Sequence, residues 1–247
     1  MKHFLIILVV IIGTPLFVSS QNIKEILPDT IKEGYFETNY GTLVISGNFV
    51  DYKREGNWIT YFKSGQIHII EHLIDGKRNG LYAKVNKRGY IVEQTNYTED
   101  SLDGKKLLFN TGGRLLLSEN YKMGKLDGKK KVFYEKGSLQ EESNYIDGLK
   151  NGVNIWYNMK SDTIAIYNYH DGEFHGLQKT FYANGNTKSE QSYKHNTIDG
   201  EYLEFYQNGN TRISGNYTKG SKHGEWLTYD EDAVLIKKEE FKKGKLQ

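Results

Sequence analysis

Histidine is the residue type in this sequence with the best prospect of binding a metal ion, because the chain has seven histidines and no cysteine. His175 and His223 stand two periods apart in a 24-residue repeat. Two strands per repeat would separate them by roughly 19 Å, whereas a zinc ligand lies about 2 Å from its ion. His170, His175 and His195 come closer together, near turns of adjacent repeats. We expect these three to be exposed turn residues, and we predict no metal site and no cofactor.

Catalytic motifs are absent from the sequence. It contains no nucleophile elbow, no phosphate-binding loop and no zinc-protease helix motif. The lack of cysteine also excludes a thiol nucleophile, a disulfide scaffold and a cysteine-based metal site. The acidic residues are scattered, and near-equal repeats offer no unique constellation of the kind that catalysis needs. We therefore predict no catalytic residues and a protein that is not an enzyme.

A strict glycine period organises residues 34–247. Glycine recurs every 24 residues at 56, 80, 104, 128, 152, 176, 200 and 224, and Gly34 opens a unit that is two residues shorter. Self-similarity at a fixed period is typical of repeat architectures. The predicted segments are a signal peptide (1–20), an N-terminal cap or linker (21–33) and nine repeats: 34–55, 56–79, 80–103, 104–127, 128–151, 152–175, 176–199, 200–223 and 224–247.

Each unit has the pattern of one β-hairpin. With the opening glycine as position zero, an aromatic residue occupies position five in all full units except the one with Val85. Glycine usually occupies position nine, and a large residue, mostly tyrosine, occupies position seventeen. Short segments rich in Tyr, Phe, Ile and Thr between glycine turns are typical of hairpins, and a lone hairpin is marginally stable, so neighbours must stack. We predict an all-β fold, an elongated solenoid-like single sheet of about nine stacked hairpins, on the order of 85 Å long.

The hairpin loop decides which side chains share a face. A three-residue loop ending in a left-handed glycine at position nine would place positions three, five, eleven and seventeen in one apolar layer, with positions two and six on the opposite, polar face. Because Trp and Tyr are favoured at interfaces, the tryptophans and tyrosines at positions two and six are candidates for partner binding. They are Trp58, Tyr82, Tyr134, Tyr182, Tyr202, Tyr206 and Trp226. The alternative is that the sheet twists or closes enough to make them part of the core.

The N-terminus has the pattern of an export signal. The positive start Met1–His3 precedes the apolar run Phe4–Ile12, and small residues end at Ser20, where we predict cleavage. The apolar stretch to Val18 is shorter than the about 20 residues that a membrane span needs. We predict an exported protein that works in the periplasm, on the cell surface or after secretion.

The charge balance bears on the class of partner. A formal net charge of +2 gives no argument for nucleic acid, since nucleic-acid binding usually needs a strongly basic face. The predicted partner is a protein, with self-association included. Clusters such as Lys129–Lys131 make membrane lipid an alternative, although Glu135 flanks that cluster.

Units such as GEYLEFYQNGNTRISGNYTKGSKH (200–223) and GLQKTFYANGNTKSEQSYKHNTID (176–199) resemble the MORN-repeat variant family of bacteria, whose members are often labelled antitoxins. The resemblance covers residues 34–247. It rests on the aromatic at position five, the turn glycine, the tyrosine at position seventeen and closing turns such as Lys222-His223-Gly224. It implies an extended sheet of stacked hairpins, and eukaryotic MORN proteins have been associated with membrane lipids, scaffolding and self-association. We expect a non-catalytic exported interaction scaffold; the alternatives are an antitoxin or immunity protein that binds a toxin, and a lipid-associated module.

Overall fold

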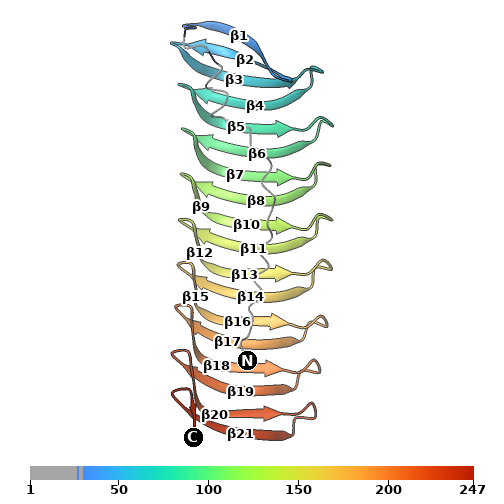
Figure 1. The fold of residues 1–247 in the computed structure, drawn as a ribbon, viewed down its shortest axis with the longest axis vertical. Helices are drawn as coiled ribbons and strands as arrows, with labels where there is room; N and C mark the ends of the chain where they lie inside the picture. Colours follow the sequence, from blue (N-terminus) through green and yellow to red (C-terminus); the bar gives the residue numbers. More distant parts are fainter. Residues whose placement is uncertain (1–26, 28–29) are drawn as a thin grey trace.

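The computed structural model describes Leu27 and residues 30–247. In this part the chain forms 22 β-strands and no helix, and the strands pair antiparallel in one sheet. The sheet is a long column of stacked hairpins that runs from β1 at one end to β21 at the other (Figure 1). The prediction of an all-β, elongated single sheet is confirmed. The predicted signal peptide (1–20) and most of the predicted cap, including Pro28, lie outside the described residues.

The strands follow one another along the column in chain order. Their bounds are β1 Gly34–Tyr40, β2 Leu43–Val50, β3 Lys53–Phe62, β4 Ile67–Ile74, β5 Lys77–Val85, β6 Ile91–Thr98, β7 Ser101–Phe109, β8 Leu115–Lys122, β9 Lys125–Leu126, β10 Gly128–Phe133, β11 Leu139–Ile146, β12 Leu149–Lys150, β13 Gly152–Tyr157, β14 Thr163–His170, β15 Glu173–Phe174, β16 Gly176–Phe181, β17 Thr187–Lys194, β18 Thr197–Phe205, β19 Thr211–Thr218, β20 Ser221–Tyr229, β21 Leu235–Lys242 and β22 Lys245–Leu246.

The hairpin loops have the predicted form. In the loop between β3 and β4, the N–H of Phe62 donates to the carbonyl of Gln66 at 2.8 Å, and Gly65, at a φ of +83°, donates to the carbonyl of Phe62 at 2.9 Å. The same bonds close the loops in which Ser161 (φ +71°) and Ala233 (φ +63°) replace the glycine. The three-residue loop with a left-handed residue at position nine is therefore confirmed in all full units.

Each opening glycine marks a bend in the chain. Between β4 and β5, Leu73 pairs with Arg78 and Glu71 pairs with Tyr82, so three residues of β5 face one residue of β4. The opening glycines lie in such bulges at φ values between +72° and +116°, where glycine alone is unstrained. Because a bulge bends its strand, each unit has a long arm, from position zero to seventeen, and a short arm, from eighteen to twenty-three.

Asparagines at position sixteen bond to the backbone of this bend. The side-chain amide of Asn120 donates to the carbonyl of Lys129 at 2.6 Å, and that of Asn144 donates to Val153 at 3.0 Å. The carbonyl of Asn120 accepts the N–H of Asp127 at 2.9 Å. These bonds satisfy backbone groups that the bulge leaves without a ladder partner. The asparagine that precedes the position-seventeen tyrosine in most units therefore has a structural reason.

A second bulge, within every full hairpin, changes which side chains share a face. In the second unit Thr60 pairs with Ile69 but Tyr61 pairs with Ile67, which leaves His68 as an extra residue. The same shift recurs in the other seven full units. A one-residue shift moves side chains to the opposite face, so position seventeen pairs with the opening glycine and lies with positions two and four. The prediction that position seventeen shares a face with positions three, five and eleven is wrong.

We call the side with positions two, four, six, fifteen and seventeen the inner face, and the side with positions one, three, five, eleven and fourteen the outer face. Position twenty-two of the short arm also contacts the inner face, and the bend encloses it. At the first two units the buried apolar cluster consists of Ile45, Phe49, Trp58 and Leu73. Leu27 and Ile31, from the segment before β1, pack against this cluster.

Candidate interaction surfaces

The inner face carries a ladder of aromatic rings that crosses the junctions between units. Trp226 contacts Tyr217 at 5.0 Å and Tyr202 at 5.5 Å between ring centroids. In the middle of the column, Phe174 contacts Tyr169 at 4.8 Å and Tyr193, in the next unit, at 5.6 Å. Neighbouring hairpins therefore bury each other's rings, as the stacked architecture requires.

Two of the candidate binding residues are core residues. Trp58 is 1% exposed and Trp226 is 4% exposed, so the prediction that they lie on a solvent-facing surface is wrong. Their indole N–H groups donate to the carbonyls of Asn48 at 3.1 Å and Asn216 at 3.2 Å. The physical reason is the extra bulged residue at position twelve, which brings position seventeen onto the same face and covers position two. Tyr82 and Tyr202, also at position two, are half-buried.

The position-six tyrosines fasten one repeat to the next. Each donates its phenolic proton to the position-five carbonyl of the following unit: Tyr134 to Tyr157 at 2.9 Å, Tyr182 to Phe205 at 2.7 Å and Tyr206 to Tyr229 at 2.9 Å. These bonds occupy the polar tips that we expected to meet a partner. Positions two and six do share a face, as predicted; the role of these tyrosines in binding stays a prediction.

Charged groups also enter the inner face. The buried carboxylate of Glu71 pairs with Arg54 at 3.1 Å and with Arg78 at 2.7 Å. The guanidinium of Arg54 lies 5.4 Å from the Trp58 ring centre, and that of Arg78 lies 4.9 Å from Tyr82. Burial lowers the pKa of Arg54, whereas for Arg78 the Glu71 carboxylate outweighs burial and the pKa is raised. The repeat pattern of aromatic residues did not predict this ion-pair cluster. The arginines at position twenty-two were the feature of the sequence that could have indicated it.

Further along the column the inner face becomes polar. Position two holds Lys106, Lys130, Asn154 and Gln178 in the middle units, between the aromatic residues of the two ends. Lys130 pairs with Glu119 at 3.1 Å, and the amide of Asn154 donates to Glu141 at 2.8 Å. These partners lie within the sheet itself, although the Oδ1 of Asn154 and the Oγ of Ser143 are buried without a hydrogen-bond partner.

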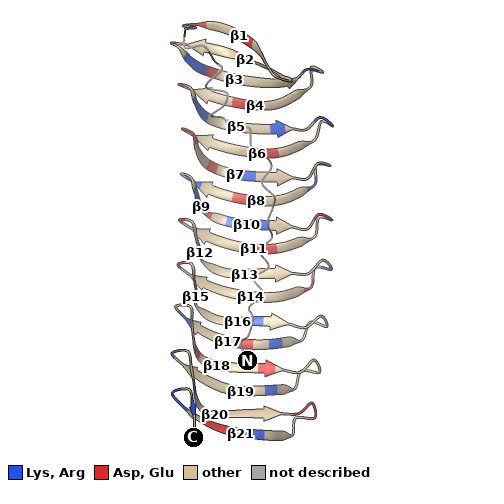
Figure 2. Cartoon of the chain, viewed as in Figure 1, with Lys and Arg blue, Asp and Glu red and all other residues tan. Residues whose placement is uncertain are grey.

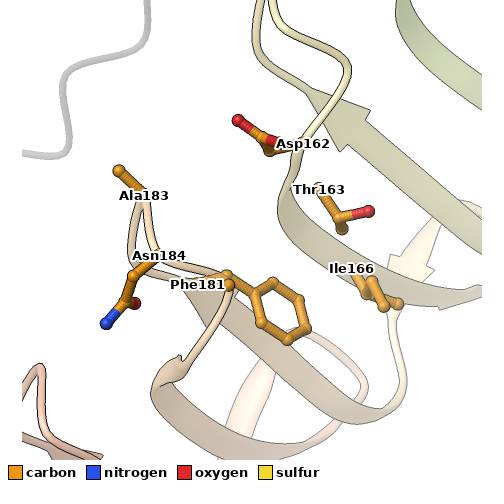
Figure 3. A pocket seen from close by; sticks show the side chains of 7 residues that line it. Asp162, Thr163, Ile166, Phe181, Ala183 and Asn184 are labelled. Atoms are coloured by element: carbon orange, nitrogen blue, oxygen red, sulfur yellow. The ribbon is translucent and has the colours of Figure 1, made fainter.

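The outer face leaves apolar side chains accessible. The position-five residues stand in one row, one per hairpin, and are half-buried. Beside them Ile67 is 38% exposed and Ile91 is 41% exposed. A shallow pocket of about 420 Å³ interrupts this face between the sixth and seventh units. Figure 3 shows Phe181 and Ile166 beside it and Asp162 at its rim.

The three clustered histidines lie in a row on the short arm. The ring centres of His170 and His175 are 5.7 Å apart, and those of His175 and His195 are 5.4 Å apart. All three are exposed near turns, as predicted. Nδ1 of His195 lies 2.8 Å from a carboxylate oxygen of Glu173.

Metal and membrane features were sought among the described residues. No group of three or more histidines and carboxylates in that part of the chain is arranged to hold a metal ion. Nor does Leu27 or the segment 30–247 include a helix that is long and apolar enough to cross a membrane.

Comparison with known proteins bears on the repeat itself. The family model described as MORN repeat variant matches residues 126–147, 174–195 and 198–219. Each match begins at position twenty-two on a short arm, passes through the bend and hairpin, and ends at the next two-residue turn. No curated protein matches the chain.

Proposed function

Because this chain belongs to the MORN repeat variant family, whose repeats generally act as protein- or lipid-interaction modules, we propose that it is an exported, non-catalytic scaffold that binds a protein partner along its outer face. The observation that carries the proposal is the continuous row of position-five side chains, seven of them Tyr or Phe in eight full units. Tyr and Phe are both enriched at protein interfaces because they bury a large apolar area. The rigid sheet holds that row at a fixed spacing.

A protein partner suits this face better than an anionic lipid surface does. Four of the five lysines on the outer face pair with neighbouring acids; Glu142, for example, pairs with Lys129 at 2.8 Å and with Lys131 at 3.1 Å. Lys179 pairs with Glu190 at 2.7 Å. A face whose lysines are mostly paired gains little from anionic headgroups, whereas its apolar row can still be buried against a partner.

The experiment is affinity capture of partners from the protein's own cells by three forms of the chain. We expect the pair Ile67→Ser and Ile91→Ser, on the outer face, to lose the proteins that the wild type captures. Ile74→Ser is the matched control, because Ile74 is 43% exposed but lies on the short arm. Equal capture by all three forms would overturn the outer face as the binding surface. Capture of a toxin would select the antitoxin alternative, and flotation with anionic vesicles in place of any captured protein would select the lipid alternative.

The export part of the proposal is tested by determining where the chain begins and in which cell fraction it is found. We expect mass spectrometry to find a chain that begins at Gln21 in the extracytoplasmic fraction. A chain that retains residues 1–20 and stays in the cytoplasm would contradict the export part of the proposal.

A further inference from the structure

The three-residue hairpin loops (positions seven to nine of each full unit), together with the residue at position ten that follows each loop, form one edge of the column, which we call the loop edge. Its charge changes sign along the column. Exposed cations occupy the loops of the second to fourth units: Lys63, Lys87, Arg88 and Arg114. The last loop instead exposes Glu231 and Asp232. Figure 2 shows the contrast between the blue loop that joins β3 to β4 and the red loop that joins β20 to β21.

The middle of the loop edge carries both signs. The fifth unit exposes Glu135 and Lys136, and the sixth exposes Lys160 and Asp162. The loops of the seventh and eighth units carry amides and no formal charge. The edge therefore runs from basic through mixed and neutral to acidic.

The loop-edge charges lack an opposite charge as partner, although the carboxylates of Glu135 and Asp162 accept hydrogen bonds from neighbouring asparagine amides and Arg114 donates to the carbonyl of Glu135. None of the loop-edge cations and carboxylates named above forms an ion pair with any residue of the described segment 30–247. The opposite edge, made of the two-residue turns, behaves differently, because there Lys53 pairs with Asp75 at 3.1 Å and Lys77 with Glu99 at 2.7 Å. Several charges are thus paired within the chain at the edge of two-residue turns, whereas the named charges of the loop edge form no ion pair.

The loop edge is also held at a regular spacing. The amides of Asn184 and Asn186 donate to the carbonyl of Gln207 in the next loop, at 2.9 and 3.0 Å. Asn208 and Asn210 repeat the arrangement on Glu231. A charged row fixed in this way can meet another row only if that row has the same pitch.

We infer that the loop edge binds the loop edge of a second copy of this chain, running antiparallel, with the loops of the fifth and sixth units at the two-fold axis. In this alignment Lys63 of one copy faces Glu231 and Asp232 of the other. At the centre, Glu135 faces Lys160 and Lys136 faces Asp162. The cations of the third and fourth units face neutral amide loops, so no like charges meet. The contact is isologous, as two-fold dimers require.

A second copy fits this edge better than another charged partner does. A uniformly anionic surface would attract the first loops and repel the last one. The second copy has the complementary charges at the same pitch, because both rows come from the same 24-residue repeat. Eight loops of three residues bring about 24 residues per copy to the contact, within the roughly 20–30 per side of a stable interface. This inference goes beyond the proposed function, since the outer face and the loop edge are separate surfaces and either can fail alone.

The test is the mass of the mature chain by sedimentation at about 0.1 M and about 1 M salt, where the Debye length is about 10 and 3 Å. We expect a dimer at the lower salt that dissociates at the higher. Two variants reverse one end each: Lys63→Glu/Lys87→Glu/Arg88→Glu makes both ends acidic, and Glu231→Lys/Asp232→Lys makes both ends basic. Each variant on its own should have a dimer dissociation constant at least about tenfold higher than that of the wild type. An equimolar mixture of the two should form heterodimers.

Restored association in that mixture separates a charge contact from a variant that fails to fold. The matched control is Lys122→Glu/Lys194→Glu, which makes the same kind of lysine-to-glutamate reversal at exposed short-arm residues. This control should leave the dimer intact. Because the chain has no cysteine, orientation can be read by disulfide formation. Ser64→Cys chains should cross-link to Asp232→Cys chains and not to one another. A monomer at both salt concentrations, variants that dimerise as the wild type does, or Ser64→Cys self-linking would overturn the inference.

Discussion

Replacing Gly137 by valine tests the hairpin loop at a position where the backbone conformation is known. Gly137 ends the loop between β10 and β11 at a φ of +96°, and its N–H donates to the Tyr134 carbonyl at 2.7 Å. A left-handed L-residue costs about 1–2 kcal/mol, and a β-branched residue is the least tolerated there. The new Cβ would lie 3.1 Å from Cδ of Arg114, a flexible side chain that can move aside. We expect the free energy of unfolding to fall by about 1–2 kcal/mol.

Ser161→Gly is the matched control for this substitution. Ser161 occupies the same loop position at a φ of +71°, so glycine relieves the strain of a left-handed side chain. Part of that gain is offset, because glycine loses more backbone entropy on folding, roughly 0.5–1 kcal/mol. We expect Ser161→Gly to be neutral or stabilising by up to about 1 kcal/mol.

The assay for both variants is urea unfolding followed by circular dichroism. A midpoint shift reports stability when the m value is unchanged, and that check matters in a repeat array, where unfolding is not necessarily all-or-none. Equal midpoints for Gly137→Val and the wild type would refute the loop assignment. Destabilisation by Ser161→Gly would refute the strain argument.

Three further predictions concern the inner face. A Cβ on Gly215 would overlap the ring of Trp226, whereas one on Gly112 would meet only an Asn110 side-chain oxygen at 3.4 Å; Gly215→Ala should therefore cost about 1–3 kcal/mol and alter tryptophan fluorescence, and an effect no larger than that of Gly112→Ala would contradict this. Glu71→Gln leaves Arg54 and Arg78 without their carboxylate and should cost about 3 kcal/mol or more, while Glu142→Gln, whose lysine partners are more exposed, should cost under about 1 kcal/mol; similar thermal midpoints would count against a buried ion-pair cluster. Burial raises the pKa of Tyr82 and Tyr202 and raises that of Tyr169 to about 12. The folded state therefore favours the protonated phenols, and their stabilisation is present below the ordinary pKa of about 10 and is lost as pH rises toward 12. Thermal midpoints should fall in that window, less steeply in Tyr169→Phe, and a flat profile to pH 12 would disprove this.

Local features of the fold could be predicted from the sequence because the interactions that produce them are local. The three-residue loop needs a left-handed residue at position nine, and glycine at that position predicts it directly. The placement of positions two and six on one face followed from strand alternation. The bend could have been predicted as well, because a glycine at the start of every unit indicates a backbone conformation that other residues avoid.

The division of side chains between the two faces could not be predicted in the same way. It depends on the bulged residue at position twelve, and that position holds His68, Val92, Leu116 and Gln140 in successive units, with no common chemistry. One extra residue reverses the faces. Trp58 and Trp226 therefore became core residues, and the exposure of the candidate binding residues was misjudged.

The sequence by itself determined the period, the hairpin, its loop and the open sheet, because each follows from backbone preferences within a few neighbouring residues. Only the tertiary structure decided which face is covered and which charges stay unmatched. The covered face depends on the bulge within each hairpin, which brings positions two and seventeen together, and the matching of charges depends on side chains more than twenty residues apart, such as Lys53 and Asp75, which stacking of the hairpins brings together. The charge gradient of the loop edge could not be predicted from the sequence either, because it becomes evident only when the loops are known to lie in one row.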